Sequence, residues 1–159
     1  MAVLDILELP KAMPRYTPVV GLDLGEKTIG VAVSDTTMAI ASPLTLINKT
    51  KFTDDARLLF ALMAERRAQG IVIGLPVNMD GTEGPRCQSS RAFARNLLRL
   101  KPELHIAFWD ERLSTAAVQR MLTDEADLSR ARRAELVDKM AATYILQGAL
   151  DRLGYAKGS

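Results

Sequence analysis

The first clear pattern in the chain is a pair of apolar runs separated by a short polar turn. Residues 19–22 (VVGL) are apolar, residues 25–27 (GEK) favour a turn, and residues 28–34 (TIGVAVS) are apolar at alternate positions. Apolar runs of this length around a glycine-containing turn predict a β-hairpin. The run at 39–47 (AIASPLTLI) also favours a strand, but Pro43 predicts that this third strand is bent or lies at a sheet edge.

Beyond residue 50 the pattern changes to helices alternating with short apolar strands. The expected elements are a helix capped by Thr53, a covered strand at 71–76, a helix at 86–100, a strand at 105–109 and a helix from about 132 to 153. Three antiparallel strands followed by such units predict an α/β fold with one mixed sheet.

Composition limits the class of protein. A chain of 159 residues, 48% hydrophobic and 25% charged, fits one globular domain. No apolar run approaches the roughly 20 residues that span a bilayer, and the N-terminal residues lack the features of a signal peptide. We therefore expect a cytoplasmic protein. The net charge of +2 is too small to indicate nucleic-acid binding by itself.

The domain boundaries follow from local composition. Residues 1–17 contain Pro10 and Pro14 and are predicted to form a flexible, extended arm. Residues 18–155 are the expected domain, and residues 156–159 a short tail.

Three carboxylates occupy positions where an ionised group needs compensation. Asp23 ends the first apolar run, Glu111 follows the strand at 105–109, and Asp138 lies at the centre of the apolar stripe of the last helix. Two readings remain for each: hydrogen bonding or pairing with an arginine, or a shared metal site.

The chemistry of the available donors narrows the choice of metal. The single Cys87 and the single His105 exclude a multi-cysteine zinc site and a histidine cluster. Three hard oxygen donors suit Mg²⁺ or Mn²⁺, and two such ions can support phosphodiester hydrolysis.

Arginines offer a candidate surface for the substrate backbone. Arg91, Arg95 and Arg99 recur every fourth residue of the helix at 86–100 and should form one stripe, which fits phosphate binding or a solvated face. The turn-rich loop at 76–85 follows a strand, where ligands bind in many α/β sheets, although an ordinary connection has the same composition.

Three sequence blocks resemble the YqgF-type family of RNase H-like nucleases, also called pre-16S rRNA nucleases or Holliday-junction resolvases. They are GLDLGEKTIGVAVSD (21–35), IVIGLPVNMDGTEGP (71–85), and DERLST (110–115) with VDKMAATYILQ (137–147). The resemblance implies a mixed five-stranded sheet flanked by helices in a single domain.

The resemblance also implies functional residues. The acids of the family carry over to Asp23, Glu111 and Asp138, and by resemblance the loop around Asn78, Asp80 and Gly81 borders the substrate. Arg91 and Arg95 of the stripe and Arg112 of the DERLST block are the other substrate-binding candidates. The implied activity is metal-dependent nuclease action in maturation of the 5′ end of 16S rRNA. The partner would be structured RNA or branched DNA, and the protein a monomer or homodimer.

Alternatives from other classes share parts of this pattern. Cleavage of Holliday junctions uses the same acids but needs two sites, hence a dimer. A non-catalytic nucleic-acid-binding module could have the same fold. Actin-like and sugar-kinase ATPases share the strand–turn–strand around a D-x-G core, but they pair two such halves, and 159 residues hold one.

Overall fold

Five strands form one mixed sheet in the order β3-β2-β1-β4-β5. A computed structural model describes residues 3–113 and 130–158, with side chains in the second segment described for 140–154. The strands are β1 (Val19–Leu24), β2 (Thr28–Ser34), β3 (Ala41–Asn48), β4 (Gly70–Leu75) and β5 (His105–Asp110). β1 pairs antiparallel with β2 and parallel with β4, and β4 pairs parallel with β5. The predicted mixed five-stranded sheet is confirmed.

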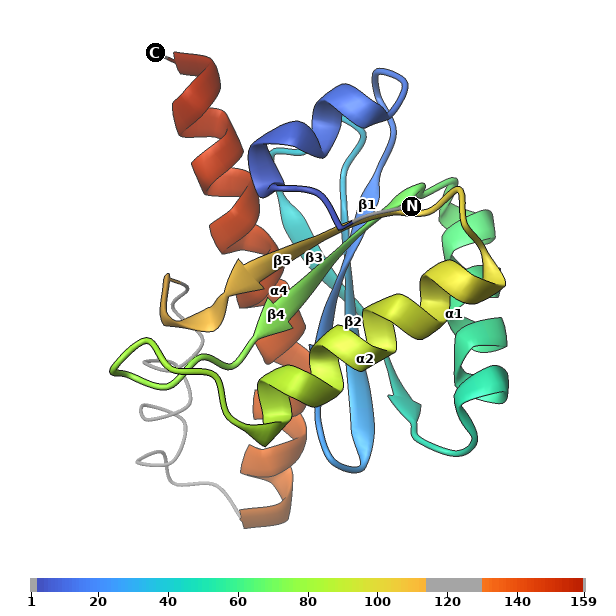
Figure 1. Cartoon of the computed structure of the whole chain (residues 1–159), viewed down its shortest axis with the longest axis vertical. Helices are drawn as coiled ribbons and strands as arrows, with labels where there is room; N and C mark the ends of the chain where they lie inside the picture. Colours follow the sequence, from blue (N-terminus) through green and yellow to red (C-terminus); the bar gives the residue numbers. More distant parts are fainter. Residues whose placement is uncertain (1–2, 114–129, 159) are drawn as a thin grey trace.

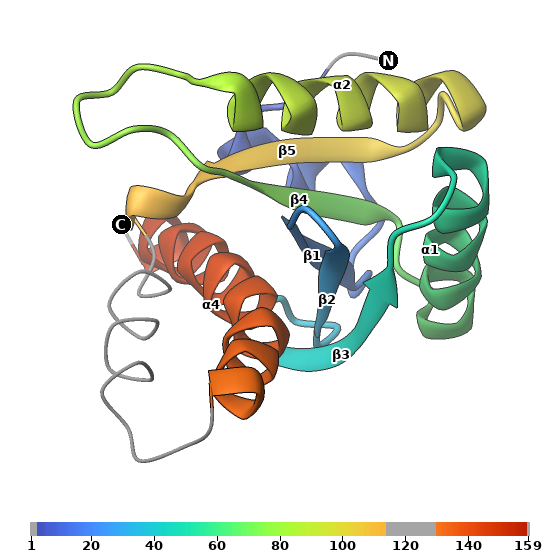
Figure 2. The same cartoon turned by 90° about the horizontal axis from the view of Figure 1, so that it is seen from below.

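Helices cover both faces of the sheet (Figures 1 and 2). On one face lie α1 (Phe52–Arg66) and α2 (Pro85–Leu100), and on the other lies α4 (Arg130–Gly158). Two apolar clusters fill the layers, one with Leu22, Ile71 and Ile106, the other with Val72 and Ile145. Side chains of successive strand residues point to opposite faces, which explains why each strand contributes to both clusters.

The third strand takes the edge position that its proline predicted. Pro43 lies opposite Ala32, and the pairing register between β2 and β3 shifts between Val31 and Ala32. A proline lacks the N–H needed to continue a ladder on both sides, so it is tolerated at an edge or a bulge.

The N-terminal segment differs from the predicted extended arm. Residues Ile6–Glu8 and Pro10–Ala12 form two short 3₁₀ helices. Ile6, Leu9 and Met13 are buried in the cluster beside α4, and the backbone N–H of Leu4 donates to the carbonyl of Ile106 on β5. Burial of these apolar side chains outweighs the effect of the prolines, so residues 3–17 pack against the domain.

Helix ends also differ from their predicted positions. α1 begins before Thr53, and the buried carboxylate of Asp55 accepts hydrogen bonds from the backbone N–H and the hydroxyl of Thr50, which fixes the entry to the helix. α4 continues through Gly154 to Gly158, so the expected tail at 156–159 is largely helical. In the described part of the chain, no helix combines the length and the apolar character that a membrane crossing requires.

Candidate active site

The carboxyl ends of β1 and β5 bring two of the three predicted acids to one end of the sheet. Asp23 lies within β1, opposite Gly30 of β2, and only 8% of its surface is exposed. Glu111 directly follows β5, in the short 3₁₀ turn Glu111–Leu113, and is half-buried. β4 runs between β1 and β5 and parallel to both, so the two acids come from either side of it.

Two glycines show that both acids lie on the face covered by α4. A Cβ atom at Gly21 would lie 2.6 Å from Cβ of Leu146 in α4, and Asp23, two residues later, shares that face. A Cβ atom at Gly74 would lie 2.5 Å from Cδ1 of Ile145 in α4 and 3.2 Å from Cγ of Glu111. The side chain of Glu111 therefore crosses the space beside Gly74.

The strand register places Gly74 next to Asp23 as well. Leu22 pairs with Ile73, so the following residues of these parallel strands, Asp23 and Gly74, are neighbours. Asp23 and Glu111 thus flank a position that carries no side chain. Carboxylate oxygens around such a space suit a hard divalent cation such as Mg²⁺ or Mn²⁺.

The third predicted acid, Asp138, rests on the sequence pattern alone. Asp138 belongs to α4, but its side chain lies outside the described residues. Within the described side chains, no group of three Asp, Glu, His or Cys residues could hold a metal ion. The metal-site assignment of Asp138 therefore stays a prediction.

Arg112 holds the loop between β4 and α2 against the end of β5. Its Nη2 donates to Oδ2 of Asp110 at 2.7 Å, its Nε donates to the same carboxylate, and its Nη1 donates to the carbonyl of Met79 at 3.4 Å. The hydrogen bond from Arg112 holds the pKa of Asp110 below its ordinary value. This predicted substrate residue therefore anchors the loop beside Glu111.

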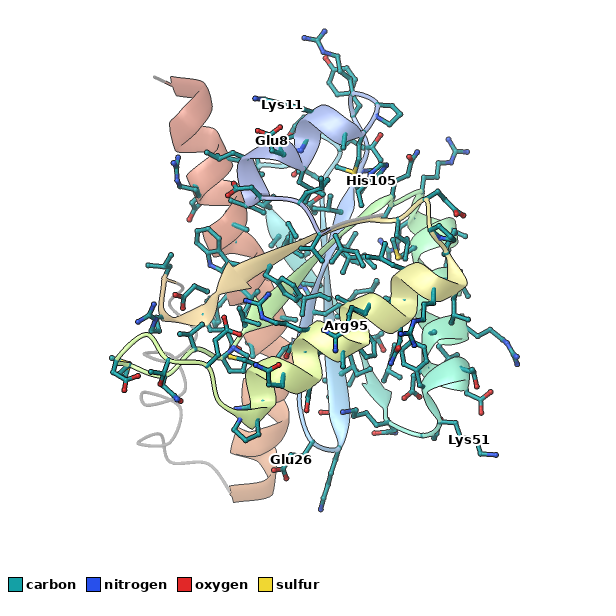
Figure 3. All side chains as sticks on the ribbon, viewed as in Figure 1. Glu8, Lys11, Glu26, Lys51, Arg95 and His105 are labelled. Atoms are coloured by element: carbon teal, nitrogen blue, oxygen red, sulfur yellow. The ribbon has the colours of Figure 1, made fainter. Side chains whose placement is uncertain are left out.

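Arg91 makes a second anchor at the other end of the same loop. Its Nε and Nη2 each donate to a different carboxylate oxygen of Glu83, both at 2.7 Å, and its guanidinium lies 5.0 Å from the ring centre of Phe108. The bond from Arg91 lowers the pKa of Glu83. Arg95, by contrast, is exposed on the outer surface of α2 (Figure 3).

The remaining predicted substrate residues form a tight turn within the loop. The N–H of Gly81, whose φ is 90°, donates to the carbonyl of Asn78 at 2.8 Å. The side-chain amide of Asn78 donates to the hydroxyl of Thr82, and the carboxylate of Asp80 accepts from that hydroxyl at 2.6 Å. The hydrogen bonds from the hydroxyl and the backbone N–H of Thr82 lower the pKa of Asp80, and together these contacts fix the shape of the loop beside the acids.

Sequence reasoning missed the residues that support this site. Asp110 and Glu83 are the partners of the two arginines, and Gly21 and Gly74 allow α4 to approach the sheet closely. A glycine inside an apolar strand run is a signal for close backbone approach, and both runs, GLDL and IVIGL, carry that signal.

Comparisons with known proteins agree with this arrangement. The family model described as "RuvX: Holliday junction resolvase" matches residues 17–152. A protein of Phenylobacterium zucineum named "Putative pre-16S rRNA nuclease" is 74% identical over 153 residues, which are 96% of this chain and 98% of that protein. A protein of Caulobacter vibrioides with the same name is 70% identical, with 96% and 98% covered.

Solved structures of low sequence identity share the fold. RuvC of T. thermophilus in complex with a Holliday junction substrate gives a TM-score of 0.52 at 10% identity, covering 87% of this chain and 96% of that one. The yeast mitochondrial Holliday junction resolvase Ydc2 gives 0.52 at 11% identity, covering 96% and 86%. With the family match over most of its length, the chain belongs to the RuvX family, whose model is described as Holliday junction resolvase.

Proposed function

We propose that this protein is a metal-dependent nuclease that hydrolyses phosphodiester bonds in the precursor of 16S rRNA, acting in maturation of its 5′ end in the cytoplasm. The observation that carries the proposal is that Asp23 and Glu111 flank the side-chain-free position of Gly74 on one face of the sheet. The names of the high-identity relatives supply the RNA substrate.

The chain's part in the chemistry is to hold oxygen donors in fixed positions. Asp23 and Glu111, together with Asp138 from α4, would hold Mg²⁺ or Mn²⁺, which when bound supplies an activated water and stabilises the charge that develops on the phosphate. Asp23 lies within a central strand and Glu111 begins a turn anchored by Arg112, so both carboxylates are positioned by rigid elements.

Substrate contacts are proposed for the residues around this end of the sheet. The turn that contains Asn78, Asp80 and Gly81 would border the substrate beside the acids. Arg95 lies on the outer surface of α2, across the sheet from the acids, so it would contact a phosphate away from the cleaved bond. Arg91 and Arg112 would support binding by fixing the loop, since their guanidinium groups are bonded to carboxylates.

Substitution of the acids tests the catalytic assignment. Asp23→Asn, Glu111→Gln and Asp138→Asn should each abolish Mg²⁺-dependent cleavage of labelled 16S precursor RNA and leave the circular-dichroism spectrum unchanged. Each change removes the charge of one oxygen ligand and keeps the size of the side chain. The assay compares Mg²⁺, Mn²⁺ and EDTA. Wild-type cleavage by purified Asp138→Asn would refute the role of Asp138.

Cleavage of a four-way DNA junction is the second candidate function. The description of the family model and the fold shared with RuvC favour it. Junction resolution requires paired active sites and therefore a dimer. A labelled four-way junction in the same assay, with the molar mass measured by light scattering, separates the two substrates. No cleavage of either substrate in Mg²⁺ or Mn²⁺ would instead indicate a non-catalytic nucleic-acid-binding module.

A further inference from the structure

A pocket of about 610 Å³ lies at the end of the sheet opposite the candidate active site. It opens between the N-terminal 3₁₀ segment, the turn that follows β2, and α4. In Figure 3, Lys11 beside this pocket and Glu26 in the hairpin after Asp23 lie at opposite ends of the molecule. Its volume falls in the range of sites that enclose a small ligand or a large side chain.

Its lining combines apolar side chains with positive charge. Leu7, Met13, Met38 and Leu153 contribute apolar surface, and Lys11 and Arg15 are the charged residues among the described lining. Lys11 approaches Glu8 only to 3.9 Å, with both side chains more than half exposed, so this pair neutralises little of the charge. The pocket therefore suits an occupant that is apolar at one point and anionic beside it.

The walls of the pocket hold two residues in an unfavourable backbone conformation. Tyr16 and Met38 have φ angles of 61° and 57°, in the left-handed region, which costs about 1 kcal/mol or more for a bulky residue. The carboxylate of Asp35 accepts from the N–H groups of Ala39 and Ile40 at 2.8 and 2.9 Å and so fixes the turn around Met38.

This conformation also presents aromatic surface to the solvent. Tyr16 is 71% exposed at the edge of the pocket. An exposed tyrosine beside an apolar pocket is typical of protein-binding surfaces, where its ring adds contact area and loses little conformational entropy.

We propose that this pocket binds a linear acidic peptide segment of a partner protein. One bulky apolar side chain of the segment would enter between Met13 and Met38, and neighbouring carboxylates would meet Lys11 and Arg15. A nucleic acid fits less well, because two cations beside an apolar lining supply few phosphate contacts. The proposal does not depend on the nuclease activity.

The test is selection of peptides from a display library of linear dodecamers on the purified full-length protein, with counter-selection on a Lys11→Glu, Arg15→Glu variant. We expect enriched peptides with a bulky apolar residue flanked by Asp or Glu. A labelled synthetic copy should bind the wild type about tenfold more tightly than this variant, because two charge pairs become repulsive.

Two further variants distinguish the effect of the pocket's charge from that of charge elsewhere, and the effect of the tyrosine ring from that of folding. Lys51→Glu with Arg57→Glu makes the same charge change at the start of α1 and should leave peptide affinity unchanged. Tyr16→Gly suits the left-handed backbone, so it should keep the melting temperature and weaken peptide binding by removing the ring.

Several outcomes would overturn the proposal. These are a library with no enrichment over the counter-selected variant, enriched peptides without acidic residues, or affinity that Lys11→Glu, Arg15→Glu leaves unchanged. Binding of a labelled single-stranded RNA dodecamer that this variant loses, without peptide binding, would assign the pocket to nucleic acid instead.

Discussion

At the scale of single residues, two arginines that looked available for phosphate are bonded to carboxylates. Arg112 donates to Asp110 and Arg91 to Glu83, each with a nitrogen–oxygen distance of 2.7 Å. A bidentate arginine–carboxylate pair fixes direction as well as distance, which a lysine cannot do. The Arg91–Glu83 pair ties the loop between β4 and α2 to the helix, and the Arg112–Asp110 pair fixes the guanidinium whose Nη1 reaches the carbonyl of Met79 in that loop at 3.4 Å.

Replacing Arg112 should release that loop. In Arg112→Ala, backbone amides of residues 77–82 should exchange hydrogen faster, and cleavage should fall about tenfold, a loss of ~1.4 kcal/mol in transition-state stabilisation. Arg112→Lys keeps the charge but loses the planar guanidinium group that donates to both carboxylate oxygens, so it should behave more like the alanine variant than the wild type. Wild-type exchange in Arg112→Ala would show that the arginine does not hold the loop.

Asp35 is expected to make stability depend on acid pH. Hydrogen bonds, first from the N–H of Ile40 and then from Thr37, lower its pKa from 3.8 to about 2. The folded state thus favours the ionised carboxylate, so its contribution is present above about pH 4 and is lost as the pH falls towards 2.

Asp35→Asn should therefore lower the free energy of unfolding by about 1 kcal/mol at pH 7, the size of a lost charged hydrogen bond. The difference from the wild type should shrink between pH 4 and pH 2 in urea titrations. Glu103→Gln, at an exposed carboxylate, is the control and should show no such dependence. A constant difference across this range would contradict the assignment.

At the scale of elements, contact between α4 and the sheet depends on two strand glycines. Gly21 on β1 and Gly74 on β4 leave room for Leu146 and Ile145 of the helix. Any larger residue would push the helix away or displace the neighbouring side chains. The two positions differ in what they touch, since only Gly74 also contacts Glu111.

This difference predicts different effects of the same substitution. Gly21→Ala and Gly74→Ala should each destabilise the fold by roughly 1–3 kcal/mol through overpacking. Gly74→Ala should also lower cleavage per folded molecule, because its Cβ would lie 3.2 Å from Cγ of Glu111.

A third glycine supplies the control for this comparison. Gly154→Ala lies within α4 with nothing within 4 Å of the added Cβ, and should stabilise the fold by about 0.5–1 kcal/mol. Thermal melting and single-turnover cleavage measure the two quantities separately. Equal cleavage by folded Gly21→Ala and Gly74→Ala would show that Gly74 does not position Glu111.

The elements that sequence patterns predicted well are those with strong periodicity. The five strands were predictable because their apolar runs are bounded by turn residues. Apolar residue type alone does not identify the buried face of a helix: Leu58 of α1 and Leu100 of α2 are 54% and 51% exposed, because the buried faces are set by contacts with the sheet. The N-terminal 3₁₀ helices are too short for a periodic signal. The prolines in this segment favoured the prediction of an extended arm, although Ile6, Leu9 and Met13 are buried.

For the candidate site, the sequence pattern predicted the acids but not the ion pairs beside them. Asp23 and Glu111 were found as acids at strand ends, where alternation and residue type suffice. The pairing of Arg91 with Glu83 depends on side-chain geometry that the helical spacing of arginines does not encode, and the pairing of Arg112 with Asp110 depends on the turn that follows β5. The same spacing fits a phosphate-binding surface and an internal ion pair.

At the scale of the whole molecule, binding of a metal ion to the acids should raise the melting temperature. A cation that binds only the folded state at about ten times its Kd adds ~1.4 kcal/mol, which raises Tm by roughly 3–6 °C for a chain of this size. Wild-type protein should show this rise with Mg²⁺ in differential scanning fluorimetry. Asp23→Asn should show none.

The same measurement in excess EDTA is the control for metal binding. The chelator removes the cation, so the wild type should then show no rise in Tm on addition of Mg²⁺. Lys11→Glu with Arg15→Glu, far from the acids, should keep the full response to Mg²⁺. A loss of that response in the pocket variant would contradict the separation of the two sites.

The sheet order also has a consequence for how the protein is made. Asp23 lies on the first strand in sequence, Glu111 follows the last strand, and the helix that covers them both comes after every strand. A chain interrupted before α4 would therefore carry two acids but leave the apolar surface around Gly21 uncovered. Such a fragment would also lack Asp138, the third acid proposed for the site, and its exposed apolar surface would mark it for chaperones and proteases.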